Sequence, residues 1–189
     1  MSKVLRLLVL AISMAFMSAS AASAQLAIGL TGGVNSSTLT GSVPDSINVS
    51  SKTGGAGGVY ANIYLGKRFS VEGQLLFAGQ GFEANSVAVT QGYIQIPALL
   101  KVYFGHLNIF AGPGVSWQTS CSADATSGTT TCDAANTSLW NGIAGAGIQF
   151  GRLGAEVHYQ TGFSDTFDTV NASYGVWSFM GRFAILGSR

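Results

Sequence analysis

The most constraining feature of this sequence is a period-two alternation of apolar residues with small or polar ones, repeated in segments of roughly ten residues. In the segment near 92–104, for example, Ile94 and Ile96 alternate with Tyr93 and Gln95. Successive side chains of a strand point to opposite faces, so each segment predicts a β-strand with one apolar face. About ten residues is also the length that a tilted strand needs to cross a bilayer. Eight such segments occur, near residues 26–35, 56–65, 69–80, 92–104, 107–118, 138–150, 153–163 and 174–186.

The connections between these segments alternate strictly between long and short. Stretches rich in Ser, Thr, Asn, Asp and Gly follow every odd-numbered segment, whereas only two or three residues follow each even-numbered one. This pattern is typical of a bacterial outer-membrane barrel with both termini in the periplasm. We therefore predict an all-β, eight-stranded antiparallel up-and-down transmembrane β-barrel. Its short periplasmic turns are expected at 66–68, 105–106 and 151–152, and its long extracellular loops at 36–54, 81–91, 119–137 and 164–173.

Composition argues against the main alternative classes of protein. Only 9% of the 189 residues are charged, whereas a soluble domain carries about 25%. The one continuous apolar run, residues 7–16, is too short for a membrane-spanning helix, which needs about 20 residues. A soluble barrel or sandwich would place many charges on the polar face of its strands; here the predicted strands carry only four full charges. A net charge of +1 gives no support to nucleic-acid binding.

The first residues read as an export signal rather than as part of the fold. Lys3 and Arg6 precede an apolar centre, and Ala22-Ser23-Ala24 forms a small-residue cleavage site. This order is typical of a secretory signal peptide that is removed from the mature protein. We expect a signal peptide at 1–24 and an outer-membrane β-barrel domain at 25–189.

Aromatic residues gather at both ends of the predicted strands. Two such rings match the interfacial girdles of a membrane barrel. We predict one girdle near the short turns, formed by Phe69, Phe104, Phe150 and Phe183, and one near the long loops, formed by Trp117, Trp140, Phe163 and Trp177.

The few charges on the predicted strands share the inward face. An eight-stranded barrel is just wide enough for its inward side chains to fill it, so an open diffusion pore is not expected. A charge in such a lumen must be paired or hydrogen-bonded, and two acids with two bases cancel. We therefore predict an internal charge network formed by Glu72, Lys101, Glu156, His158 and Arg182.

Two residues of this predicted network, Glu156 and His158, could instead have a catalytic role. Glu156 and His158 lie on one strand face, and a Glu–His pair could activate a serine such as Ser178 or Ser116. Buried pairs of titratable groups that only shift each other's pKa values are several times more frequent than catalytic pairs. We therefore predict that the protein is not an enzyme. No phosphate-binding loop is found, and we expect neither a cofactor nor a metal.

The two cysteines of the chain, Cys121 and Cys132, both fall in the third predicted loop. In an exported protein this favours a disulfide, which would contribute roughly 3 kcal/mol by closing the loop. Two ligands without a nearby histidine do not make a metal site.

Two motifs resemble the PorT-like outer-membrane β-barrel family, common in Bacteroidota and often named "porin family protein". They are Tyr-Ile-Gln-Ile-Pro-Ala-Leu-Leu-Lys at 93–101 and Leu-Asn-Ile-Phe-Ala-Gly-Pro-Gly at 107–114, and segments 28–35 and 67–77 are also similar to that family. The resemblance covers essentially the whole mature chain. It implies an eight-stranded barrel folded by the outer-membrane assembly machinery, and little about activity, although the founding member belongs to a secretion apparatus. The chain ends on Arg189 rather than on an aromatic residue, which departs from the usual insertion signal.

The same resemblance suggests two candidate glycosylation sites. Asp45-Ser46-Ile47 and Asp168-Thr169-Val170 are similar to the Asp-Ser/Thr-aliphatic sequences at which Bacteroidota glycosylate exported proteins.

From the sequence, the function expected is that of an integral outer-membrane barrel without enzymatic activity, serving as an envelope component or a platform for surface loops. An accessory subunit of a secretion or gliding-motility complex, a lipid A-modifying enzyme and a narrow channel stay open as alternatives. The expected partners are outer-membrane lipids, lipopolysaccharide and the assembly machinery; protein partners are unknown, and nucleic acid is not expected.

The charges of the sequence are distributed unequally between the two ends of the predicted barrel. The predicted loops contain one base (Lys52) and six acids (Asp45, Glu83, Asp124, Asp133, Asp165 and Asp168), whereas the turn end contains four bases (Lys67, Arg68, Arg152 and Arg189).

Overall fold

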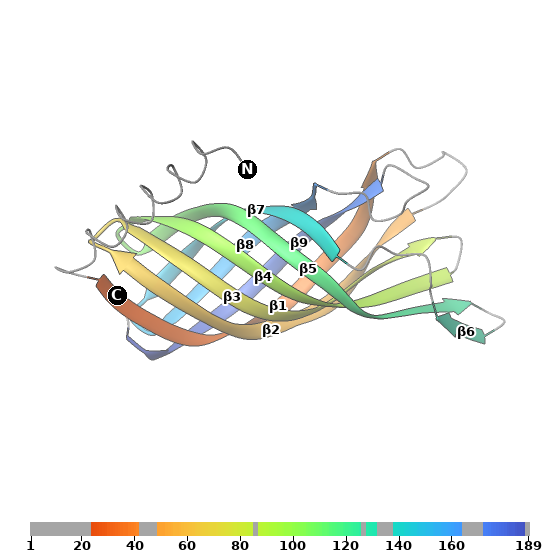
Figure 1. Cartoon of the computed structure of the whole chain (residues 1–189), viewed down its shortest axis with the longest axis horizontal. Helices are drawn as coiled ribbons and strands as arrows, with labels where there is room; N and C mark the ends of the chain where they lie inside the picture. The colour runs from red at the N-terminus through yellow and green to blue at the C-terminus, as the bar shows by residue number, and fades with distance from the viewer. Residues whose placement is uncertain are drawn as a thin grey trace, which may run out of the picture.

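A closed antiparallel β-barrel makes up the computed structural model, which describes residues 24–41, 49–84, 87–125, 128–131, 138–163 and 172–187. Each barrel strand pairs with the next along the chain, and β9 pairs with β1 to close the cylinder (Figure 1). The predicted fold class is therefore confirmed. No helix within these ranges is long and apolar enough to cross a membrane. The eight barrel strands are β1 (Ala24–Gly41), β2 (Val49–Leu65), β3 (Phe69–Ala84), β4 (Val87–Phe104), β5 (Leu107–Ala125), β7 (Ser138–Phe150), β8 (Leu153–Gly162) and β9 (Ala172–Leu186).

The two faces of every strand differ as the alternation predicts. On β3, Glu72, Gln74 and Leu76 point inward and are buried, while Val71 and Phe77 point outward and are exposed. Exposed large apolar side chains cover the outer wall of all eight barrel strands, whereas buried polar and charged side chains fill the interior. This arrangement reverses that of a soluble protein and matches a barrel with its outer face in hydrocarbon.

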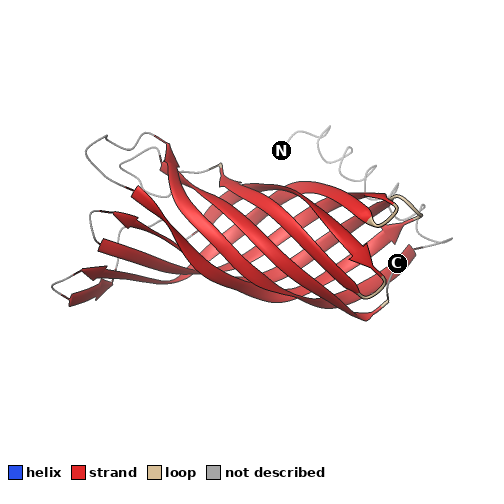
Figure 2. Cartoon of the chain, turned by 180° about the vertical axis from the view of Figure 1, so that it is seen from behind, coloured by secondary structure: helices blue, strands red, loops and turns tan. Residues whose placement is uncertain are grey.

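Short turns close one end of the barrel. They join β2 to β3, β4 to β5 and β7 to β8, at the three places predicted from the sequence (Figure 2). Each contains a glycine in the left-handed region, such as Gly66 with φ 76°, where other residues are strained. Ala24 pairs with Leu65 and Ile28 with Leu186, so the first and last strands begin and end at this same turn end.

The opposite end differs from the prediction, because the strands continue into the expected loops. β3 and β4 stay paired as far as Ala84 and Val87, within the stretch expected to be the loop 81–91. β5 runs on to Ala125, and a short strand, β6 (Gly128–Thr131), folds back on it as a hairpin. Figure 1 shows this sheet projecting well beyond the barrel. The predicted strand limits were wrong here because these stretches are rich in Ser, Thr, Asn, Asp and Gly, a composition typical of loops, while backbone hydrogen bonds still extend the ladder.

Candidate functional site: the charge network of the lumen

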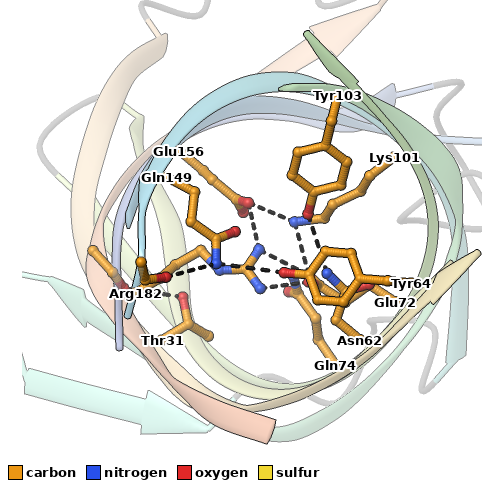
Figure 3. A network of polar contacts seen from close by, with 12 residues as sticks. Thr31, Asn62, Tyr64, Glu72, Gln74, Lys101, Tyr103, Gln149, Glu156 and Arg182 are labelled. Carbon is orange, nitrogen blue, oxygen red and sulfur yellow. Dashed lines mark hydrogen bonds and ion pairs between the residues drawn. The ribbon is translucent and has the colours of Figure 1, made fainter. Parts of the chain in front are cut away.

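The centre of the lumen holds four charged side chains from four different strands. Glu72 lies on β3, Lys101 on β4, Glu156 on β8 and Arg182 on β9, and all four side chains converge across the interior (Figure 3). Each occupies an inward position of its strand, with an exposed fraction between 0% and 7%. Hydrogen-bond register places Lys101 near Glu72 on one wall and Arg182 near Glu156 on the other.

Each base contacts both acids. The Nζ atom of Lys101 lies 3.0 Å from Oε1 of Glu72 and 2.5 Å from Oε1 of Glu156. The guanidinium of Arg182 forms ion pairs with both carboxylates, and its Nη1 donates to Oε1 of Glu72 at 3.0 Å. Two of these contacts join neighbouring strands and two cross the lumen, so the four side chains tie opposite walls together. We call this set the charge quartet.

Polar and aromatic side chains complete the environment of the quartet. Gln74 donates from Nε2 to Oε1 of Glu72 at 2.6 Å. The guanidinium of Arg182 lies 3.9 Å from the ring centre of Tyr60, and the ammonium of Lys101 lies 4.7 Å from that of Phe110. Both distances are short enough for cation–π attraction. Glu72, Lys101 and Arg182 thus each have a polar or π partner in addition to their ion pairs.

A second polar cluster contains Tyr64 and Tyr103, whose ring centres are 5.7 Å apart. Asn62 donates to the hydroxyl of Tyr103 at 3.1 Å, and Gln149 donates to that of Tyr64 at 3.4 Å. The alternation placed the tyrosines and Asn62 on the inward face, but it did not indicate that they would meet. Neither these residues nor Gln74 was singled out from the sequence, because uncharged polar side chains are common on that face.

Within the described residues His158 makes no hydrogen bond or ion pair with the quartet, and its predicted place in the charge network stays a prediction. Its ring packs edge-on against Phe110 with ring centres 6.1 Å apart, and its Nδ1 has no hydrogen-bond partner among the residues that the structure describes. Because a strand rises about 3.3 Å per residue, His158 lies roughly 7 Å further along β8 than Glu156. The histidine therefore occupies a separate layer of the lumen.

The acid of the catalytic constellation considered from the sequence is engaged by the quartet. Ser178 is the cross-strand neighbour of His158, but the carboxylate of Glu156 is occupied by the two bases of the quartet. The hydroxyl of Ser116 accepts a hydrogen bond from Asn141 at 2.8 Å. Within the described residues, no group of three or more His, Cys, Asp or Glu side chains is placed to hold a metal ion.

The eight aromatic residues predicted to form girdles all lie exposed on the outer wall, with exposed fractions from 42% to 73%. On β7, Trp140 and Phe150 are ten residues apart and lie near opposite ends of the strand. At about 3.3 Å per residue and a tilt near 40°, that separation corresponds to roughly 25 Å along the barrel axis, the height expected of an apolar band. Their assignment to girdles stays a prediction.

The predicted disulfide can be followed at one of its two cysteines only. Cys121 lies on β5, where its Sγ is 3.5 Å from Nε2 of Gln91. Cys132, both candidate glycosylation sites and residues 1–23 of the predicted signal peptide lie outside the described residues. The disulfide, the modifications and the signal peptide stay predictions.

A closed barrel with an apolar outer wall and a paired, charged lumen defines a transmembrane β-barrel protein of the bacterial outer membrane. The chain belongs to the family of outer membrane proteins with a beta-barrel domain, whose model matches residues 18–168. The predicted family type and location are thereby confirmed, while a PorT-like, Bacteroidota origin stays a prediction. Comparison with curated protein sequences finds no match.

Solved structures with the same fold come from other bacterial outer membranes. Neisserial surface protein A is 12% identical, with a TM-score of 0.58, over 82% of this chain and 96% of that one. The attachment invasion locus protein Ail of Yersinia pestis is 12% identical, with a TM-score of 0.52, over 85% of this chain and 98% of that one. Ail in complex with the heparin analogue sucrose octasulfate gives 13% identity and a TM-score of 0.51, over the same shares of both chains. At these identities the likeness concerns the fold.

Proposed function

We propose that this chain is a non-enzymatic envelope barrel that closes its own lumen and displays an extended sheet outside the membrane. The observation that carries the proposal is the charge quartet, in which Lys101 and Arg182 each contact both Glu72 and Glu156. The lumen of an eight-stranded barrel has room for little beyond its own side chains. A layer of four paired charges across it supports a plugged anchor rather than a diffusion channel.

The projecting strands support the display role. Trp117, the predicted outer girdle residue of β5, pairs with Ile94 of β4, yet β4 begins at Val87 and β5 ends at Ala125. The seven or eight further residues of each strand extend the sheet by about 25 Å along the strand direction. The β6 hairpin adds to its tip. A rigid barrel that carries such an extension is suited to holding residues away from the lipid surface.

Charge sets the chemistry that this projection offers. The Ail complex contains a polyanionic heparin analogue, whereas residues 36–54, 81–91, 119–137 and 164–173 of this chain carry six acids and one base. An acidic surface repels a polyanion, so we do not carry that ligand over. We propose instead that the acidic end shares divalent cations with lipopolysaccharide phosphates.

The alternatives receive less support. A lipid A-modifying enzyme would need Glu156 to serve His158, but both bases of the quartet hold its carboxylate. A narrow channel would have to pass the quartet. Membership of a secretion or gliding-motility complex is neither favoured nor disfavoured by an observation on the described residues.

Three measurements test the proposal. Purified protein in planar bilayers should give no conductance steps, and regular steps would refute the closed lumen. Overexpression should leave the lipid A mass spectrum unchanged; a new lipid A species that disappears with His158→Ala would refute the non-enzymatic role. External protease added to intact cells should cut within 119–137 and leave the barrel folded, whereas full protection of that stretch would contradict display outside the cell.

A further inference from the structure

The lipid-facing wall carries a hollow of about 560 Å³ near the turn end, where β5, β7, β8 and β9 lie side by side. Its floor includes the small residues Ala146, Ala155 and Gly181, and its sides include Leu107 and Phe179. Ala155 is the cross-strand partner of both Ile148 and Gly181, so small outward residues on neighbouring strands adjoin one another. The surroundings of the hollow are almost entirely apolar.

Packing does not require the hollow. A Cβ atom built on Gly181 would meet only a backbone oxygen at 3.6 Å, which is ordinary van der Waals contact. A larger side chain could therefore project there and fill the space. In a membrane this space is filled by something from outside the chain, because apolar surface left without a neighbour forfeits its dispersion contacts.

A second, more polar hollow of about 300 Å³ lies between the β4–β5 turn and the β7–β8 turn. It is lined by Gly105, His106, Gln149 and Gly151. His106 is fixed there, since its Nδ1 lies 3.1 Å from the backbone oxygen of Gln149 and its ring stacks on Phe150 with centres 4.7 Å apart. The two hollows are lined by residues at neighbouring chain positions, because His106 precedes Leu107 and Gln149 follows Ile148.

The turn-end aromatic residues mark the boundary between the two hollows. Phe104, Phe150 and Phe183 lie exposed at this end of their strands. The apolar hollow lies on the barrel side of these residues, at Ile148 and Gly181, and the polar hollow lies at the turns. Aromatic side chains concentrate where hydrocarbon gives way to headgroups. The pair of hollows therefore has the layout of a site for an amphiphile, with an acyl chain below the boundary and a headgroup beyond it.

Charge selects the kind of headgroup. The three short turns contain Lys67, Arg68 and Arg152 and not a single acidic residue. Arg152 directly follows Gly151 of the polar hollow and is exposed. A cation at a membrane surface attracts anionic lipid headgroups.

We propose that the two hollows bind one anionic glycerophospholipid, with an acyl chain against Gly181 and Ala155 and its phosphodiester beside His106 and Arg152. A lipid fits this position better than a second copy of the chain. Two barrels meeting side by side would contact each other along the height of the wall, whereas the hollow is confined to the turn end and continues into a polar one.

Native mass spectrometry of the full-length protein, released from detergent micelles containing equal amounts of phosphatidylglycerol and phosphatidylethanolamine, tests the proposal. We expect one retained lipid, with phosphatidylglycerol favoured. Gly181→Leu should fill the hollow and abolish retention. Gly73→Leu is the matched control, because it adds the same side chain on the outer wall of β3, where a Cβ meets nothing within 4 Å. Gel mobility before and after heating verifies that each variant is folded.

The headgroup is tested separately with Arg152→Gln, which should lower the preference for phosphatidylglycerol about fivefold, the factor expected on losing one surface cation. Arg68→Gln, in another turn, should keep the preference. Equal retention by the Gly181→Leu and Gly73→Leu variants would overturn the site, and so would equal retention of both lipids by the wild type. A dimer that Gly181→Leu abolishes would assign the hollow to a second copy and also overturn it.

Discussion

Lys101→Met is the sharpest test of the charge quartet as a structural element. The lysine side chain is fully buried, and its ammonium contacts both carboxylates. Methionine keeps a similar apolar stem but removes the charge, which leaves Glu72 and Glu156 facing Arg182 alone with a net charge of −1 in the lumen. Breaking a buried pair by removing one partner costs about 3–5 kcal/mol, because the remaining charge is buried and uncompensated. We expect the free energy of unfolding to fall by about that amount.

The assay is urea unfolding in lipid vesicles, followed by tryptophan fluorescence and by gel mobility with and without heating. Lys52→Met is the matched control: this lysine is partly exposed and donates to Oγ1 of Thr90 at 2.6 Å. Its loss should change stability by less than about 0.5 kcal/mol.

A double-mutant cycle separates charge imbalance from lost packing. Lys101→Met combined with Glu156→Gln restores neutrality and leaves Glu72 paired with Arg182, so the double variant should regain most of the lost stability. Two results would refute the reasoning. The first is a Lys101→Met variant as stable as Lys52→Met, and the second is a double variant whose losses simply add.

Three further predictions concern the wall, the close strand contacts and the cysteines. Gly112→Ala should destabilise the barrel by about 1–3 kcal/mol, because its Cβ would lie 1.9 Å from a backbone oxygen of β4; Gly73→Ala should be neutral by the same unfolding assay. Leu30→Arg, placed midway along the exposed wall of β1, should cost about 2–4 kcal/mol, whereas Leu26→Arg near the turn end should cost at most about 1 kcal/mol; equal losses in vesicles would contradict the depth argument. The two cysteines should resist alkylation until a reductant is added, as intact-mass measurement can show, and labelling without reductant would rule out the disulfide.

The barrel could be predicted from the sequence because one face of each strand meets lipid. On β4, Leu100 and Lys101 are adjacent in the chain, and the first is 53% exposed while the second is fully buried. Hydrocarbon tolerates no charge without a penalty, so the alternation is enforced wherever a strand crosses the membrane. The short turns could also be predicted from the sequence, since each is two or three residues long and contains a glycine.

The strand ends could not be predicted for the opposite reason. Gly81 pairs with Thr90 and Ala84 with Val87, within a stretch interpreted as a loop. Water accepts polar side chains on both faces of a strand, so no alternation marks a ladder that has left the membrane. The β6 hairpin, formed by Gly128–Thr131, was missed because it lies in such a stretch.

The members of the quartet could be predicted only in part. Alternation assigned Glu156 and His158 to the lumen, and both point there. Whether two inward residues meet depends on their height along the barrel axis. That height is determined by the register and the tilt of the strands. Four strands bring Glu72, Lys101, Glu156 and Arg182 to one level, while the histidine lies in the next layer. A sequence pattern assigns a residue to a face, and only the closed barrel assigns it to a level.

The scarcity of charge and the proposed closure of the lumen follow from one constraint. The outer wall excludes charge because it faces hydrocarbon, and the lumen admits charge only where acids and bases balance. The quartet meets that condition with two of each, and the same four side chains occupy the space through which a conduction path would run. Truncating one of these side chains to open the lumen would leave one buried charge uncompensated. A substitution that opens the lumen at this level should therefore also destabilise the barrel. A conducting relative built on the same fold should therefore have lost an acid and a base of the quartet together, because losing one alone leaves the penalty of an unpaired charge.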